Sequence, residues 1–101
     1  MTIGKKIMAN EIVRAEIIVS GLVQGVGFRY FVYTQATLLG VKGITKNLYT
    51  GEVFTIAEGE KALVEELIKK IKVGPMHASV RGFNVKWKAA TNEYSTFEID
   101  Y

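Results

Sequence analysis

Cysteine is absent from this chain of 101 residues, and histidine and proline occur once each, as His77 and Pro75. Without cysteine the protein has no disulfide, no thiolate nucleophile and no cysteine-based metal site. A Ser-His-Asp triad or a histidine-based metal site would depend on His77 alone, and a histidine so close to Pro75 is more typical of a surface loop. Acidic residues and histidine nowhere show the spacing of metal ligands. We therefore expect neither a metal nor a cofactor.

Long apolar runs are also missing from the first ten residues, Met1–Asn10, which excludes a signal peptide or membrane span there. We interpret residues 1–10 as a flexible extension and residues 11–101 as one domain, and we expect a monomer in the cytoplasm. The net charge of +3 suits a small anionic ligand. Lysine and arginine alternate with glutamate, so nucleic acid is not an expected partner. The cluster Lys69, Lys70 and Lys72 fits a solvated helix face.

Periodicity divides the chain into strands and helices. Apolar residues alternate with polar ones at Val13–Ser20, and they recur every three or four residues at Arg29–Gly40 and Glu60–Val73. Further strands are expected at Val41–Leu48, at Glu52–Ala57, around Val80–Trp87 and at Phe97–Tyr101. The short turn Tyr49-Thr50-Gly51 predicts a hairpin. The order βαββαβ with a small terminal strand predicts an α+β fold, with one antiparallel sheet and both helices on one face.

The segment Gly21–Arg29, between the first strand and the first helix, has the composition of an anion site. Glycines let backbone N–H groups converge on one point, and the start of a helix adds unpaired N–H groups and the positive end of a dipole. Arg29 supplies a planar fork of donors that suits phosphate oxygens. A plain strand-to-helix connection is the alternative, but it leaves the cation Arg29 at an unfavourable position, at a cost of about 0.3–1 kcal/mol.

Asn47 is expected at the same edge of the sheet as this loop. A helix of 12 residues, Arg29–Gly40, runs about 18 Å away from the loop, and the strand Val41–Leu48 returns a comparable distance. The Asn47 carboxamide has both a donor and an acceptor, which orienting a water molecule requires. The alternative role is turn chemistry before Tyr49-Thr50-Gly51. From the residues alone the turn role is favoured.

Gly21–Arg29 resembles the complete signature loop of the acylphosphatase family, Gly-x-Val-Gln-Gly-Val-x-Phe-Arg. The resemblance extends over roughly residues 13–101, and it includes Lys46-Asn47 with Gly51-x-Val53, Gly74-Pro75 with Val80, and Phe97-x-Ile99-x-Tyr101. It implies a ferredoxin-like α/β sandwich. It also implies hydrolysis of the carboxyl–phosphate anhydride of acyl phosphates without metal or cofactor.

The same resemblance implies roles for individual residues. The phosphate would be bound by Arg29 and by the loop amides of Gln24, Gly25, Val26, Gly27 and Phe28, and Asn47 would place the attacking water. The catalytic pair would thus be Arg29 and Asn47, and inorganic phosphate would be both product and inhibitor.

Two departures from the family pattern are visible. The extension Met1–Asn10 is longer than in the shortest members, and Asp100 stands where a basic residue is frequent. The second departure is expected to alter local ion pairing and stability but not the phosphate site.

Two other functions compete with this interpretation. A ferredoxin-like module could bind an anion or RNA without turnover, although Phe54 and Trp87 do not form an RNA-reading motif. A domain acting on carbamoyl phosphate within a larger maturation protein is the second, and the length of the chain speaks against it.

Overall fold

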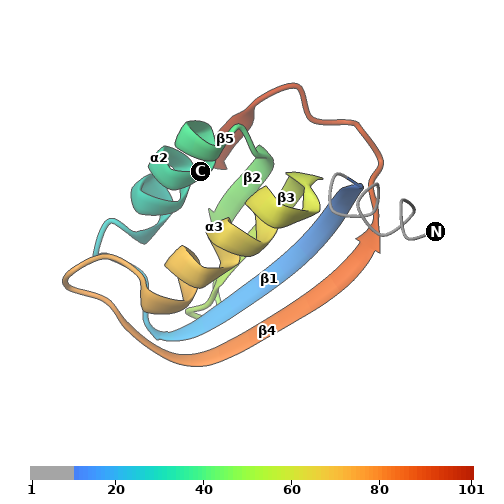
Figure 1. Cartoon of the computed structure of the whole chain (residues 1–101). Coiled ribbons are helices and arrows are strands. Elements are labelled where there is room, and N and C mark those ends of the chain that lie inside the picture. The colour runs from blue at the N-terminus through green and yellow to red at the C-terminus, as the bar shows by residue number, and fades with distance from the viewer. Residues whose placement is uncertain (1–10) are drawn as a thin grey trace.

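Five strands form one sheet, and two helices cover one of its faces, as Figure 1 shows. The computed structural model describes residues 11–101, so the predicted extension Met1–Asn10 lies outside the described residues. The elements are β1 (Ile12–Leu22), α2 (Phe28–Leu39), β2 (Lys42–Asn47), β3 (Val53–Glu60), α3 (Lys61–Val73), β4 (Ser79–Ala89) and β5 (Phe97–Asp100). Neither α2 nor α3 is long and apolar enough to cross a membrane.

The strands lie in the order β4-β1-β3-β2-β5. Strand β3 is central and pairs antiparallel with both β1 and β2, so β1 and β2 run in the same direction. This arrangement confirms the predicted α+β fold and the hairpin between β2 and β3. It also puts the C-terminal ends of β1 and β2 at one edge of the sheet.

The terminal strand corrects one expectation, because the sheet is mixed and not wholly antiparallel. Strand β5 pairs in parallel with β2, with Phe97 opposite Gly43 and Asp100 opposite Lys46. The physical reason is the path of the chain. Strand β4 runs antiparallel to β1. Residues 90–96 then cross from β4, one outer strand of the sheet, to β5, the other outer strand, and the chain reverses direction once (Figure 1). One reversal makes β5 parallel to β2.

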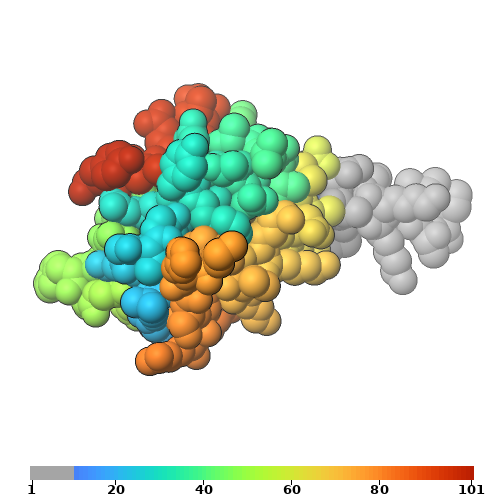
Figure 2. All heavy atoms as spheres, turned by 90° about the vertical axis from the view of Figure 1, so that its left-hand side faces the viewer, coloured from blue at the N-terminus to red at the C-terminus, as the bar shows by residue number. Residues whose placement is uncertain are grey.

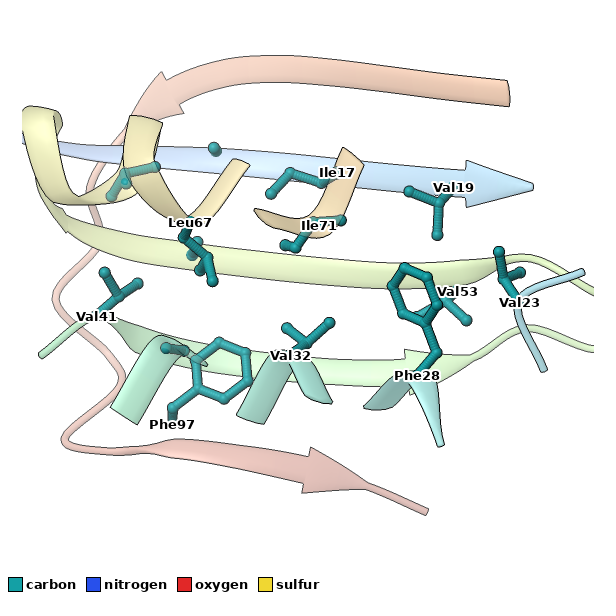
Figure 3. Packing of buried hydrophobic residues seen from close by; sticks show 14 residues of the cluster. Ile17, Val19, Val23, Phe28, Val32, Val41, Val53, Leu67, Ile71 and Phe97 are labelled. Atoms are coloured by element: carbon teal, nitrogen blue, oxygen red, sulfur yellow. The ribbon is translucent and has the colours of Figure 1, made fainter. Parts of the chain in front are cut away.

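The core lies between the sheet and the two helices (Figure 3). Alternate residues of β1 face the helices and are buried, as the period of two predicts: Ala15, Ile17 and Val19. The helices contribute one stripe each, with Phe28, Val32 and Ala36 from α2, and Val64, Leu67 and Ile71 from α3. The predicted apolar stripes are therefore confirmed.

Strand β3 is longer than predicted, and α3 begins directly after it. The predicted strand ended at Ala57, and the predicted helix began at Glu60. In the structure β3 continues to Glu60, because β1 pairs with it as far as Glu60, whereas β2 pairs with it only as far as Glu58. A charged residue is tolerated there because the Glu58 carboxylate is neutralised.

Glu58 is 4% exposed and holds the crossover to β5 in place. Its carboxylate accepts hydrogen bonds from Arg14 Nη1 at 3.2 Å, from the Thr91 amide at 2.8 Å and from the Asn92 amide at 3.0 Å. Burial alone would raise the pKa of Glu58, but the bonds from Thr91, Arg14 and Asn92 outweigh it and hold that pKa below its usual range. The charged form is therefore the one that stabilises the fold.

This network predicts an acid-sensitive stability. Because the folded pKa of Glu58 is lowered, its contribution is complete above about pH 4.3, the ordinary pKa of glutamate, and is lost as the pH falls through the folded pKa. We expect Glu58→Gln to lower the free energy of unfolding at pH 7 by about 1.5–3 kcal/mol and to flatten its fall in acid. Urea unfolding between pH 2 and pH 7 measures both effects.

The matched control is Glu66→Gln, which removes an exposed carboxylate that pairs with Lys69 at 3.7 Å. It should change the free energy of unfolding by less than about 0.5 kcal/mol. If Glu58→Gln and the wild type lost stability in parallel as the pH fell, Glu58 would not be the group that titrates.

Candidate active site

The loop between β1 and α2 comprises Val23–Gly27, and both of its ends are fixed in the core. Val23 is 0% exposed, and Phe28, the first residue of α2, is 2% exposed. The predicted loop was longer, from Gly21 to Arg29. Its first two residues, however, extend β1 by pairing with β4, and Arg29 lies in the first turn of α2. Four residues, Gln24–Gly27, therefore connect two buried anchors.

Gly25 and Gly27 give this loop its shape. Both have φ of +75°, a left-handed conformation that costs other residues roughly 1–2 kcal/mol. Within residues 11–101, the amides of the loop donate none of the recorded hydrogen bonds. The loop thus turns its N–H groups away from regular backbone pairing and leaves them available to a ligand.

No side-chain cap and no acidic residue offsets the positive end of the helix dipole at the start of α2. Its N-cap is Gly27, no side chain caps it, and no acidic residue lies in its first turn. The first bond of the helix runs from the Phe31 amide to the Gly27 carbonyl, at 3.0 Å. The preceding amides have no partner within the helix. With Arg29 beside them, these amides form a positively polarised site that an anion would stabilise.

Gln24 ties the loop to the turn between β2 and β3. Its Nε2 donates to the Leu48 carbonyl at 2.6 Å and to the Glu52 carbonyl at 2.8 Å. The side chain is therefore committed to positioning, and the backbone amide is the part of Gln24 that remains available to a phosphate. The family motif indicated the residue but not this contact between two segments.

Asn47 is the last residue of β2 and faces the loop. The recorded hydrogen bonds that close the following turn come from other groups: Leu48 N to Glu52 O at 2.8 Å, Gly51 N to Leu48 O at 3.0 Å, and the Gln24 side chain. The turn is therefore closed by groups other than the Asn47 carboxamide. This favours a role of Asn47 toward a ligand over the turn role.

These residues surround a small hollow of about 150 Å³, which we call the loop hollow. Its predicted members are Gly25, Gly27, Phe28, Arg29 and Asn47, and it is completed by Val23, Tyr30, Ile99 and Tyr101. Gln24 and Val26 do not line it: the Gln24 side chain contacts the turn, and Val26 packs against the core. Figure 2 shows the start of α2, the turn after β2 and the C-terminal residues at the same end of the molecule.

The C-terminal residues are the part of the site that sequence reasoning missed. The Tyr101 ring lies over the Arg29 guanidinium, with 5.0 Å from Cζ to the ring centroid, and Arg29 Nη1 donates a weak hydrogen bond of 3.5 Å to the Asp100 carbonyl. Because the contact of Asp100 uses its backbone, any residue at that position can supply it. The signal that was missed is the register of β5 on β2, which places Asp100 opposite Lys46, beside Asn47.

Ionisable metal ligands are not gathered anywhere in the part of the chain that the structure describes. Residues 11–101 contain no group of three or more His, Asp or Glu side chains that could hold a metal ion. His77 is exposed in the segment between α3 and β4. The loop hollow offers a ligand backbone amides, one guanidinium and one carboxamide.

Comparisons with known proteins agree with this geometry. The sequence model of the Acylphosphatase family matches residues 15–99. An acylphosphatase of Archaeoglobus fulgidus is 49% identical over 86 residues, which cover 85% of this chain and 96% of that protein. The crystal structure of acylphosphatase from Bacillus subtilis superimposes with a TM-score of 0.85 at 34% identity, covering 88% of this chain and 99% of that one.

A similar domain also occurs inside a longer protein. HypF from T. kodakarensis matches with a TM-score of 0.77 at 28% identity, and the match covers 88% of this chain but 12% of that one.

The site geometry predicts how the protein binds inorganic phosphate. Arg29→Lys keeps the charge but loses the planar fork, so we expect phosphate affinity to fall about 10- to 100-fold. Isothermal titration with phosphate measures this, and a thermal melt checks that the variant folds. Arg81→Lys is the matched control, because Arg81 is exposed on β4, and its phosphate affinity should equal that of the wild type. Unchanged affinity in Arg29→Lys would contradict the bidentate role.

Proposed function

The chain belongs to the acylphosphatase family, and on that premise we propose that the loop hollow is where it hydrolyses acyl phosphates. The observation that carries the proposal is the uncapped, acid-free start of α2 with Arg29 in its first turn, facing the same hollow as Asn47. In this proposal the phosphoryl group is bound by the Arg29 fork and by the amides of residues 24–28, of which Gly25, Gly27 and Phe28 line the hollow. Asn47 holds the water.

The reaction needs little beyond positioning and charge stabilisation. Water attacks phosphorus, the bond from phosphorus to the bridging oxygen breaks, and the carboxylate leaves with that electron pair. A carboxylate is a good leaving group, so no strong general acid is required. Phosphoryl transfer passes through a loose transition state whose charge lies on the equatorial oxygens, where Arg29 and the amides stabilise it.

The proton of the attacking water has no acidic or histidine acceptor among the residues that line the hollow. In our proposal an oxygen of the phosphoryl group accepts it, so that the products are carboxylate and dihydrogen phosphate. Inorganic phosphate would then compete with substrate. The monomeric state and the cytoplasmic location stay predictions from the sequence.

An anion-binding module without turnover is the competing function. Such a module needs Arg29 and the loop amides, and it could use the Asn47 carboxamide only as one more donor to the anion. The acylphosphatases to which this chain is similar favour hydrolysis over binding alone. Turnover of a synthetic acyl phosphate separates the two functions.

Metal-free hydrolysis is the direct test of the proposed function. We expect the protein to hydrolyse benzoyl phosphate at the same rate in excess EDTA as in buffer with Mg²⁺, because the proposed binding groups are amides and a guanidinium. Release of phosphate measured with time gives the rate. Activity that disappears in EDTA and returns with Mg²⁺ or Zn²⁺ would contradict the mechanism.

Asn47→Ala separates catalysis from binding. If Asn47 contacts the water and not the bound phosphate, its loss lowers kcat about 10²- to 10³-fold, while the inhibition constant of inorganic phosphate stays unchanged. Steady-state kinetics with benzoyl phosphate and phosphate inhibition measure both quantities. Asn84→Ala, an exposed position on β4, is the control and should retain full kcat. If Asn47→Ala lost stability but kept kcat, the role of Asn47 would be to stabilise the turn after β2 and not to orient the water.

A further inference from the structure

A second hollow continues from the loop hollow, between α2 and β5. Its volume is about 520 Å³, and it is lined chiefly by Tyr30, Tyr33, Ile99 and Tyr101, which we call the tyrosine groove. Three of these residues, Tyr30, Ile99 and Tyr101, also line the loop hollow. Three other hollows, located beside α3 and β4 or around Glu58–Glu60, share no residue with the loop hollow. The tyrosine groove is thus continuous with the proposed phosphate site.

We propose that the tyrosine groove binds the acyl group of the substrate and selects an uncharged aromatic acyl group. The inference rests on the proposed function. Pockets for larger ligands measure about 300–1,000 Å³, so the loop hollow, at about 150 Å³, holds little more than the phosphoryl group. The acyl group is joined to that phosphoryl group through one oxygen. It must therefore lie where the loop hollow opens into a neighbouring space.

Two of the aromatic rings of the groove are largely exposed, so a ligand can reach them. Tyr30 is 68% exposed and Tyr101 is 94% exposed, although both carry large apolar rings. The rings of Tyr30 and Tyr33 lie 6.2 Å apart at an angle of 32°, and the Tyr101 ring is held over Arg29. Aromatic rings interact favourably at centroid distances of about 4.5–7 Å. A planar aromatic acyl group would gain such contacts, whereas an acetyl group has no ring with which to make them.

The charges around the groove favour an uncharged acyl group. Glu98 has the one side chain of the groove lining that is charged at pH 7, so an acyl group with its own carboxylate would find no cationic side chain in the lining and would be repelled. Arg29 lies next to the groove, but it lines the loop hollow, where it faces the phosphoryl group. Shape and charge together point to substrates of the benzoyl type.

The experiment compares kcat/KM for benzoyl phosphate and acetyl phosphate in matched variants. We expect the wild type to prefer benzoyl phosphate and Tyr33→Ala to reduce the ratio of the two values about two- to tenfold. Tyr33 lines the groove but not the loop hollow, so the inhibition constant of inorganic phosphate should not change. Tyr33→Phe should keep the ratio, since the ring and not the hydroxyl provides the contact.

Two further variants distinguish a loss of groove contacts from a disturbance of folding in Tyr33→Ala. Tyr33 also packs against the core, so Tyr30→Ala, at a more exposed position, serves as the second variant and should reduce the ratio as well. Leu38→Ala is the control: Leu38 is 77% exposed on the same helix and outside the groove, and its removal should leave the ratio unchanged.

The possible failures can be told apart. A wild type that hydrolyses both substrates without preferring benzoyl phosphate would overturn the acyl site and leave the proposed function intact. An unchanged ratio in Tyr30→Ala and Tyr33→Ala would have the same meaning. A wild type that hydrolyses neither substrate would overturn the proposed function, and this inference with it.

Discussion

The burial of Val23 and Phe28 is the constraint on which the site depends. These two side chains fix both ends of a five-residue loop in the core (Figure 3), and Gly25 and Gly27 let the loop make its turn in left-handed conformations. Because Phe28 is buried, the adjacent Arg29 is held in the first turn of α2 beside the free amides. Core packing, and not a separate binding element, therefore positions the groups proposed to bind phosphate.

The sheet supplies the other half of the site. Since β1 and β2 both run antiparallel to β3, the loop after β1 and Asn47 at the end of β2 meet at one edge. The Gln24 side chain joins the two segments by hydrogen bonds to the turn after β2. The parallel strand β5 then brings Tyr101 to the same edge. Three segments that are distant in sequence thus converge on one small hollow.

Two charged residues show how structural and functional roles differ in this molecule. The Glu58 carboxylate is buried but fully hydrogen-bonded, and Arg14 neutralises it, so it stabilises the crossover to β5. Arg29 lies at the positive end of a helix, where a cation is unfavourable, and its recorded partners are an aromatic ring and a carbonyl, not a carboxylate. An incoming anion would relieve that imbalance, which is why the proposed function is placed at Arg29 and not at Glu58.

Local sequence determined most of the secondary structure of this protein, because helix periods, strand periods and glycine-rich turns depend on residues that are neighbours in the chain. The apolar stripes of α2 and α3, the hairpin of β2 and β3, the loop before Arg29 and the position of Asn47 could all be predicted. Only the tertiary structure decided that β3 continues through Glu58, that Gln24 holds the turn, and that β5 pairs in parallel and places Tyr101 over Arg29. Each of these depends on strand register or on partners far apart in the chain, which local periodicity does not encode.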